Sequence, residues 1–355
     1  MKKKSIITVA VLLCLALFST YGQTQKASYT VKCIWNTSKH CAFTSIAEFN
    51  GKYYVSFREA DSHIQDNDGV ARGAVRILAS NDGDTWTSVA YLTKSGYDLR
   101  DPKLSVTPDG RLMVTIGGSI YSGSTLIGRV PQVSFSKDGK TFSAPQDAVI
   151  DSETKNGTDW IWRVAWRGKT GYAVMYSLLA SDPKSVKKGA ALCLLETTDG
   201  INYKQRTVID LPDFPNETTV RPLGMYGGKM AMMVRGDSNV GNKMGLWGTS
   251  RPPFKKWTFR DMGMQIGGPD FIMLDRETVI AGTRKYLSGS IYQTVLLKGT
   301  PEGNFTEVMA LPSGGDNSYP GFVIVGSELW VVYYSTHESA KASIYLAKIP
   351  ISTFK

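Results

Sequence analysis

The stretch SNDGDTW at Ser80–Trp86 recurs along the chain, as SKDGKTF at Ser136–Phe142 and in a weaker form as TDGINY at Thr198–Tyr203. The shared pattern is Ser/Thr-x-Asp-Gly-x-x-aromatic. An Asp-Gly pair builds a tight hairpin turn, and the Asp carboxylate can accept backbone N–H groups within that turn. Three copies at a spacing of about one blade predict a β-propeller.

A second repeat sets the number of blades. Six times, an apolar strand-like run is followed by a turn and another apolar run, such as KYYVSF or LWVVYY. The turns lie at residues 49–52, 108–111, 167–169, 226–229, 274–277 and 325–328. This predicts an all-β, six-bladed β-propeller, in which residues 28–35 supply the outer strand of the last blade and close the ring. We expect the blades to begin near residues 40, 98, 158, 215, 267 and 316. A β-sandwich or a five-bladed ring is the alternative.

The first 22 residues have the features of a secretory signal peptide. Three lysines at Lys2–Lys4 precede an apolar run at Ile6–Phe18, and Thr20 and Gly22 are small residues suited to cleavage. This apolar run is shorter than an ordinary transmembrane helix. Cys14 raises a lipoprotein as the alternative, but Leu13 stands where such a signal needs a small residue. We therefore expect a secreted or periplasmic bacterial protein with one propeller domain over residues 23–355, and a monomer.

Charge and cysteine content limit which ligands, disulfides and metal sites the sequence predicts. The formal net charge is +10, and loss of the three leader lysines leaves +7. A basic surface favours acidic ligands, and without a Lys/Arg-rich run an acidic glycan suits an exported protein better than nucleic acid. Cys33 and Cys41 could pair, and Cys193 is expected to be a buried apolar residue. No Cys/His spacing suggests a zinc site, and neither metal nor cofactor is expected.

The blade geometry predicts where a site should lie. The start of each innermost strand and the end of the second strand share one face of the ring, and the Asp-Gly turns lie on the other. Polar or aromatic residues occupy these positions within apolar strands, which costs free energy unless they are paired or used. The candidates are Arg58, Glu59, Arg100, Asp101, Trp160, Arg163, Glu217, Arg221, Arg235, Asp270, Arg284, Tyr319 and His337. Salt bridges that join the blades are the alternative for any one of them.

Tryptophans and a short motif add two further hypotheses. Trp160, Trp162 and Trp166 alternate along one predicted strand, so they should face one way and could stack on a sugar ring. Core packing is the alternative for them. Arg100-Asp101-Pro102 matches a motif of five-bladed fructosidase-type enzymes, in which the Asp stabilises the transition state; a salt-bridged strand entry is the alternative.

Three segments resemble the sialidase family, and the resemblance covers nearly the whole mature chain. They are residues 56–86, the pair Glu217 and Arg235, and the late Ser318-Tyr319. The resemblance implies that Tyr319 is the nucleophile, Glu217 its base and Arg235 a ligand of the sugar carboxylate. The general acid would be an aspartate of the first-blade loop, where Asp66 and Asp68 suit the family's placement better than Asp61. The implied activity is exo-hydrolysis of a terminal acidic sugar from a glycan.

The sequence departs from the family in its arginines. The family opens with Phe-Arg-Ile-Pro, whereas this chain has His40-Cys41-Ala42-Phe43. For the third arginine, Arg284 is near in sequence but is expected on the wrong side of its strand pair, so Arg58, Arg100, Arg163 and Arg221 are stand-ins. A neutral terminal sugar therefore stays open. So do a non-catalytic glycan-binding propeller and a polysaccharide lyase with His40, His337 or Tyr319 as its base.

Overall fold

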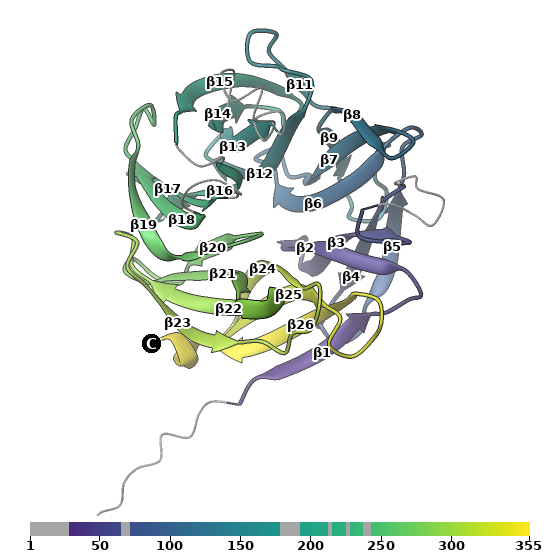
Figure 1. The fold of residues 1–355 in the computed structure, drawn as a ribbon, viewed down its shortest axis with the longest axis vertical. Helices are drawn as coiled ribbons and strands as arrows, with labels where there is room; N and C mark the ends of the chain where they lie inside the picture. The colour runs from purple at the N-terminus through teal and green to yellow at the C-terminus, as the bar shows by residue number, and fades with distance from the viewer. Residues whose placement is uncertain (1–27, 65–71, 178–191, 212–214, 225–227, 237–242) are drawn as a thin grey trace, which may run out of the picture.

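The structure is a computed structural model that describes residues 28–64, 72–177, 192–211, 215–224, 228–236 and 243–355. The predicted signal peptide lies outside these residues. Six antiparallel sheets are arranged around a common axis (Figure 1). The fold is therefore the six-bladed β-propeller that the repeats predict.

Each blade contributes four strands, counted here from the axis outward. The innermost strands are β2 (His40–Phe49), β6 (Asp98–Val106), β12 (Asp159–Arg167), β16 (Pro215–Leu223), β20 (Asp270–Met273) and β24 (Ser318–Val325). The second strands are β3 (Lys52–Ala60), β7 (Leu112–Ser122), β13 (Thr170–Ser177), β17 (Lys229–Gly236), β21 (Val279–Tyr286) and β25 (Glu328–Ser335). The third strands are β4 (Ala74–Ser80), β9 (Gln132–Ser136), β14 (Leu192–Thr197), β18 (Met244–Ser250), β22 (Tyr292–Gly299) and β26 (Ser343–Pro350). The outer strands are β5 (Thr87–Leu92), β10 (Gln146–Asp147), β15 (Asn202–Ile209), β19 (Thr258–Gln265), β23 (Phe305–Ala310) and β1 (Thr30–Trp35).

Two short strands fall outside this plan. β8 (Thr125–Arg129) forms an extra hairpin with β7, and β11 (Val149–Ile150) pairs in parallel with β15. Two 3₁₀ helices, η2 (Ser288–Ser290) and η3 (Ile351–Phe354), complete the described elements. None of the helical segments among the described residues has the length and apolarity needed to cross a membrane.

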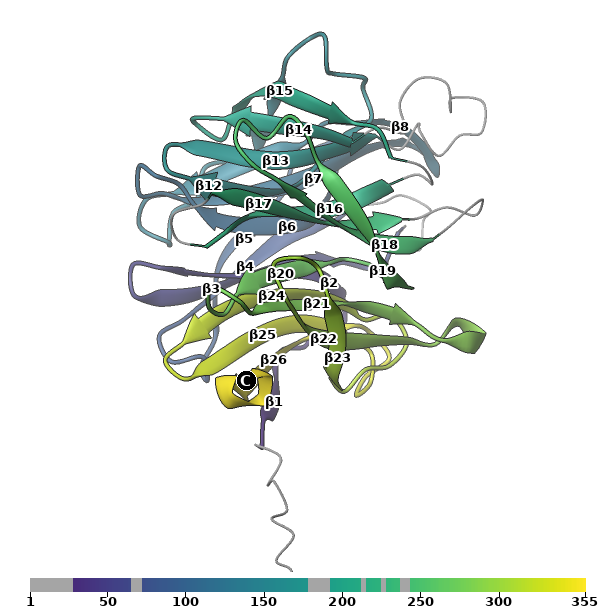
Figure 2. The ribbon, with the colours of Figure 1, turned by 90° about the vertical axis from the view of Figure 1, so that its left-hand side faces the viewer.

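The blade boundaries agree closely with the sequence prediction. Strands were expected to begin near residues 40, 98, 158, 215, 267 and 316, and the innermost strands begin at His40, Asp98, Asp159, Pro215, Asp270 and Ser318. The predicted closure is also confirmed, because β1 pairs with β26 of the last blade. Figure 2 shows β1 and η3 together on the side of the ring that the last blade forms. Pairing the first strand with the last blade removes an open sheet edge.

The repeated Asp-Gly turns have the expected internal hydrogen bonds. Asp82 Oδ1 accepts the N–H groups of Asp84 at 2.8 Å and Thr85 at 2.9 Å. Asp138 does the same for Lys140 at 2.8 Å and Thr141 at 2.7 Å. These bonds satisfy turn N–H groups that would otherwise need water, so the Asp is a structural requirement of the turn.

The glycines of these turns sit against the preceding blade. A Cβ on Gly139, in the second blade, would collide with Tyr54 of the first blade, and a Cβ on Gly83 would collide with Trp330 of the last. Gly200 is placed in the same way against Met113. The turn therefore docks one blade on the next, which explains why it recurs at blade spacing.

The cysteines differ from expectation. Cys33, Cys41 and Cys193 are all free, so the pairing considered for Cys33 and Cys41 is wrong. Cys193 is only half-buried, because β14 is the third strand of its blade and its Sγ lies beside Gln205 of the outer strand.

Candidate active site

The innermost strands share an irregularity near their first residues. Five of the six have a register shift against the second strand, at 42/45, 100/103, 161/164, 215/218 and 318/321. Such bulges re-aim side chains. Three residues within them, Phe43 (φ 66°), Asp101 (φ 46°) and Tyr319 (φ 52°), adopt left-handed backbone conformations that non-glycine residues rarely occupy. Strain of this kind gathers at functional sites.

The bulges surround a cavity of about 250 Å³ at the predicted face. Its lining combines residues from strand entries, strand exits and loops. They are Phe43, His63, Arg100, Asp101, Arg129, Trp160, Tyr176, Asn216, Glu217, Arg235, Arg284 and Tyr319. Seven of the predicted site residues are thereby brought together: Arg100, Asp101, Trp160, Glu217, Arg235, Arg284 and Tyr319.

A three-residue network lies in this cavity. The Tyr319 hydroxyl donates a hydrogen bond of 2.5 Å to Glu217 Oε1. Arg235 Nη1 lies 2.8 Å from the same oxygen and 3.5 Å from the Tyr319 hydroxyl. The second oxygen, Glu217 Oε2, accepts the Gly268 N–H at 2.7 Å. The carboxylate is thus fixed from both sides and points one oxygen at the phenol.

The surroundings shift the pKa values of Glu217 and Tyr319 in opposite directions. Burial raises the pKa of Glu217, but Arg235, the Tyr319 hydroxyl and the Gly268 N–H outweigh burial and hold the pKa of Glu217 below its usual value. Burial and the Glu217 carboxylate raise the pKa of Tyr319 well above its ordinary value, despite Arg235 and Arg284. A neutral phenol therefore faces an ionised carboxylate, as a nucleophile faces its base.

Asp101 is a second carboxyl group in the cavity with a contrasting environment. It is buried, and its Oδ1 has no hydrogen-bond partner among the described residues. Burial and the Glu217 carboxylate raise its pKa, although Lys103 and Arg100 oppose them. Burial lowers the pKa of the neighbouring Lys103 to about 7. Two carboxyl groups whose pKa values are pushed apart are suited to separate acid and base roles.

Arg129 and Tyr176 are site residues that the sequence analysis missed. Arg129 ends β8, an extra strand that the six-hairpin pattern does not contain. Tyr176 stands at the end of β13, where the rule for strand exits would have found it. Arg129 Nε has no partner among the described residues. His63, Phe43 and Asn216 also line the cavity but were not proposed as site residues.

Arg284 lies in the cavity, so the expectation that it stands on the wrong side of its strand pair is wrong. β21 runs antiparallel to β20 and returns its last residues to the site face. The Arg284 guanidinium donates to Asp316 Oδ1 at 2.9 Å and to the Asn317 carbonyl at 2.6 Å. Arg100 is likewise held from behind, with Nη1 3.1 Å from Asp98.

Six other predicted residues do not line the cavity. Most are held in ion pairs, the alternative considered for them: Arg58 with Asp98, Glu59 with Arg76, and both Arg163 and Arg221 with Asp270. His337 packs on Tyr345 with ring centroids 4.3 Å apart, and its Nδ1 lies 2.9 Å from Ser335 Oγ and its Nε2 3.7 Å from Glu338. Asp66 and Asp68 lie outside the described residues.

The three tryptophans do not form one platform. Trp160 lines the cavity, whereas Trp162 is fully buried and donates to Thr219 Oγ1 at 3.2 Å. Trp166 packs in a different apolar cluster. The register shift between Ile161 and Val164 breaks the alternation on which the prediction depended.

Comparison with known proteins gives a fold-level answer. No protein-family model matches the chain, and no curated protein matches its sequence. Among solved structures, a protein of unknown function from Dyadobacter fermentans matches with a TM-score of 0.73 at 19% identity, over 92% of this chain and 100% of that one. Several neighbours with named activities are glycoside hydrolases.

Two of these hydrolases illustrate the range. A Trypanosoma rangeli sialidase in complex with the inhibitor DANA matches with a TM-score of 0.62 at 14% identity, over 87% of this chain and 55% of that one. The α-L-arabinofuranosidase Arb93A of Fusarium graminearum matches with a TM-score of 0.64 at 13% identity, over 93% and 99%. The chain spans about half the length of the sialidase and nearly all of the arabinofuranosidase, and shares their propeller fold.

Proposed function

We propose that this protein is an exo-acting glycoside hydrolase that removes a terminal acidic sugar from a glycan, with Tyr319 as nucleophile and Glu217 as its base. The observation that carries the proposal is the 2.5 Å hydrogen bond from the Tyr319 hydroxyl to Glu217 inside the cavity. A phenol is a weak nucleophile at neutral pH unless a base takes its proton. Glu217 is ionised and oriented for that transfer.

The reaction balances with these groups. Glu217 takes the phenolic proton while the Tyr319 oxygen attacks the anomeric carbon, and a general acid protonates the departing glycosidic oxygen. Water then attacks the anomeric carbon and displaces the Tyr319 oxygen. The conjugate base of the acid takes a proton from this water, and Glu217 returns its proton to Tyr319. A sialidase of this fold is known in complex with 2,3-difluorosialic acid as a covalent intermediate, which supports a covalent route.

Two parts of the chain offer candidates for the general acid. The resemblance to sialidases assigns it to Asp66 or Asp68. Within the described residues, Asp101 is the alternative, because it lines the cavity, its Oδ1 has no described partner and its pKa is raised. A carboxyl group that stays protonated near neutral pH can donate to a leaving group.

The charges of the cavity favour an anionic sugar. Four arginines line it, Arg100, Arg129, Arg235 and Arg284, against two carboxyl groups, Asp101 and Glu217. Guanidinium groups suit a sugar carboxylate because they can donate two parallel hydrogen bonds to it. The arginine excess is the reason for preferring an acidic substrate over a neutral one such as arabinose.

The test is turnover of a panel of aryl glycosides and oligosaccharides that end in sialic, uronic or neutral sugars. We expect release of an acidic sugar by the wild type. Glu217→Gln should lower kcat by about 100-fold to 10,000-fold, and Tyr319→Phe by at least as much. Tyr333→Phe is the matched control, because Tyr333 is a buried tyrosine that donates to the Pro312 carbonyl away from the cavity.

Each alternative has its own outcome. Equal rates for Tyr319→Phe and Tyr333→Phe would refute the tyrosine nucleophile. Binding of a glycan without turnover of any member of the panel would indicate a glycan-binding propeller. A product that absorbs in the ultraviolet, from an unsaturated uronic acid, would indicate a lyase.

A further inference from the structure

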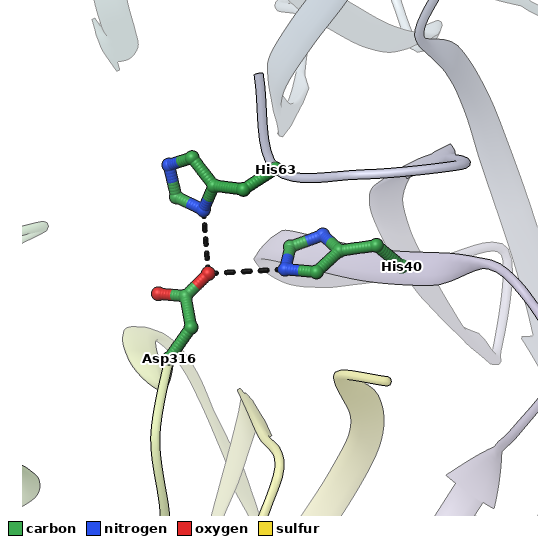
Figure 3. A group of neighbouring side chains, drawn as sticks. All are labelled: His40, His63 and Asp316. Atoms are coloured by element: carbon green, nitrogen blue, oxygen red, sulfur yellow. Dashed lines mark hydrogen bonds and ion pairs between the residues drawn. The ribbon is translucent and has the colours of Figure 1, made fainter. Parts of the chain in front are cut away.

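Three side chains from separate segments lie together (Figure 3), and one of them, His63, lines the cavity. His40 begins β2, His63 follows β3, and Asp316 precedes β24. Asp316 Oδ2 lies 3.0 Å from His40 Nε2 and 2.5 Å from His63 Nδ1. One nitrogen of each ring and this oxygen all lie within 4.8 Å of one another. The function proposed above uses none of the three.

The other carboxylate oxygen of Asp316 already accepts two hydrogen bonds. Its Oδ1 accepts Arg284 Nη2 at 2.9 Å and the Tyr334 hydroxyl at 2.9 Å. These contacts fix the carboxylate plane and leave Oδ2 turned toward the two imidazoles. Groups behind a metal-binding carboxylate commonly hold it in this way.

Both histidines present a ring nitrogen to Asp316 Oδ2. The His40 side chain is nearly buried. Its Nε2 is the ring nitrogen that has a described polar neighbour. The His63 side chain is 40% exposed, so its ring can adjust and its side of the cluster is open to solvent.

We propose that His40, His63 and Asp316 form a binding site for a divalent transition-metal ion of the zinc type. Two imidazole nitrogens and one carboxylate oxygen are a ligand set that zinc uses in sites with an open position. With metal–ligand bonds of about 2.0–2.1 Å, tetrahedral ligand atoms stand roughly 3.4 Å apart. The Asp316–His40 separation of 3.0 Å is close to that value, and the partly exposed His63 side chain has to shift to reach it.

The position of this site points to a role in binding the sugar, and this role rests on the proposed function. His63 lines the cavity, and its ring lies 5.2 Å from Phe43, whose ring lies 5.0 Å from that of Tyr319. His40 stands in the segment where the sialidase pattern has its opening arginine. A metal ion at this site would supply positive charge on that side and leave an open position for an anionic or hydroxyl group of the sugar. No spacing in the sequence indicates this site, because the three ligands lie on separate segments.

The test is zinc binding by the mature chain after removal of any purification tag. Calorimetric titration with ZnCl₂ should show one site per chain, and Co²⁺ in its place should give visible absorption bands of a low-symmetry site. His63→Ala and Asp316→Asn should each weaken zinc binding at least tenfold. His337→Ala is the matched control for metal binding, because it removes the remaining histidine, which packs on Tyr345.

The outcomes separate this proposal from the proposed function. If the wild type binds no more zinc than His63→Ala, or if His337→Ala loses as much as His63→Ala, the metal site is refuted whatever the protein hydrolyses. His63→Ala keeps the test valid if Asp316→Asn fails to fold, because His63 is exposed. If zinc binds as expected and no glycan is cleaved, the site stands and the hydrolase proposal falls.

Discussion

The guanidinium of Arg129 lies over the ring of Trp160, 4.6 Å from its centroid, at the wall of the cavity. Burial lowers the pKa of Arg129 despite nearby tyrosines and Asp101, and its Nε has no hydrogen-bond partner among the described residues. The stack holds the guanidinium in place without neutralising it. Arg129 is therefore the arginine of the cavity that is best prepared to receive an anion from outside the protein.

Replacement of Arg129 should weaken substrate binding more than catalysis. We expect Arg129→Ala to raise KM for an acidic glycoside about tenfold or more, a loss of about 1.4 kcal/mol, with a smaller change in kcat. Arg111→Ala is the matched control, because Arg111 stacks on Phe135 at 4.1 Å away from the cavity. Steady-state kinetics would contradict the assignment if both variants had the KM of the wild type.

The pH profile should report the environment of Glu217. A base whose pKa is depressed stays ionised to lower pH, so kcat/KM should hold until the pH falls below the ordinary glutamate value of about 4.3. Arg235 is the strongest opposing influence on the burial of Glu217. Arg235→Met should therefore move the acidic limb upward by about 1 unit or more.

The position of the limb is the readout, because Arg235→Met will also lower the rate. Arg260→Met is the control, since Arg260 is an outer-strand arginine that contacts Glu302 and Asn304. An acidic limb at the same pH in both variants would show that Glu217 is not the group that titrates.

The sequence predicted the architecture better than the directions in which individual side chains point. Alternation and turns placed Glu217, Arg235 and Tyr319 at one face, because a strand pair returns to its starting face whatever its local details. The bulges could not be predicted, and the bulge between Arg100 and Lys103 brings the consecutive residues Arg100 and Asp101 to the same cavity, which a regular strand would not do. Arg129 was missed because β8 is an addition to one blade and has no counterpart in the repeat.

A buried ion pair between the first two blades should dominate the stability of that contact. Arg58 Nε and Nη2 lie 2.9 and 2.8 Å from Asp98 Oδ1, and both side chains are fully buried. Arg58→Met removes the cation that faces Asp98 Oδ1 and leaves the buried carboxylate with Arg100 at Oδ2 as its remaining described cation, and we expect a loss of about 3–5 kcal/mol in the free energy of unfolding. Urea denaturation measures the loss.

An exposed pair provides the comparison. Lys285 lies 2.8 Å from Glu307, and both side chains are about one-third exposed. Lys285→Met should cost under about 1 kcal/mol. Equal costs for Arg58→Met and Lys285→Met would show that the buried pair does not hold the two blades together.

Because the turns dock one blade on the next, alanine should destabilise the protein more at one of two glycines that share the same backbone conformation. Gly139 (φ 71°) and Gly110 (φ 77°) both lie in the left-handed region, so alanine strains each by about 1–2 kcal/mol. A Cβ on Gly110 would meet nothing within 4 Å, whereas a Cβ on Gly139 would collide with Tyr54 of the preceding blade. Gly139→Ala should therefore cost about 1–3 kcal/mol more than Gly110→Ala. If urea unfolding gives the same loss for both, backbone strain alone explains the glycine, and the turns are not the joints between blades.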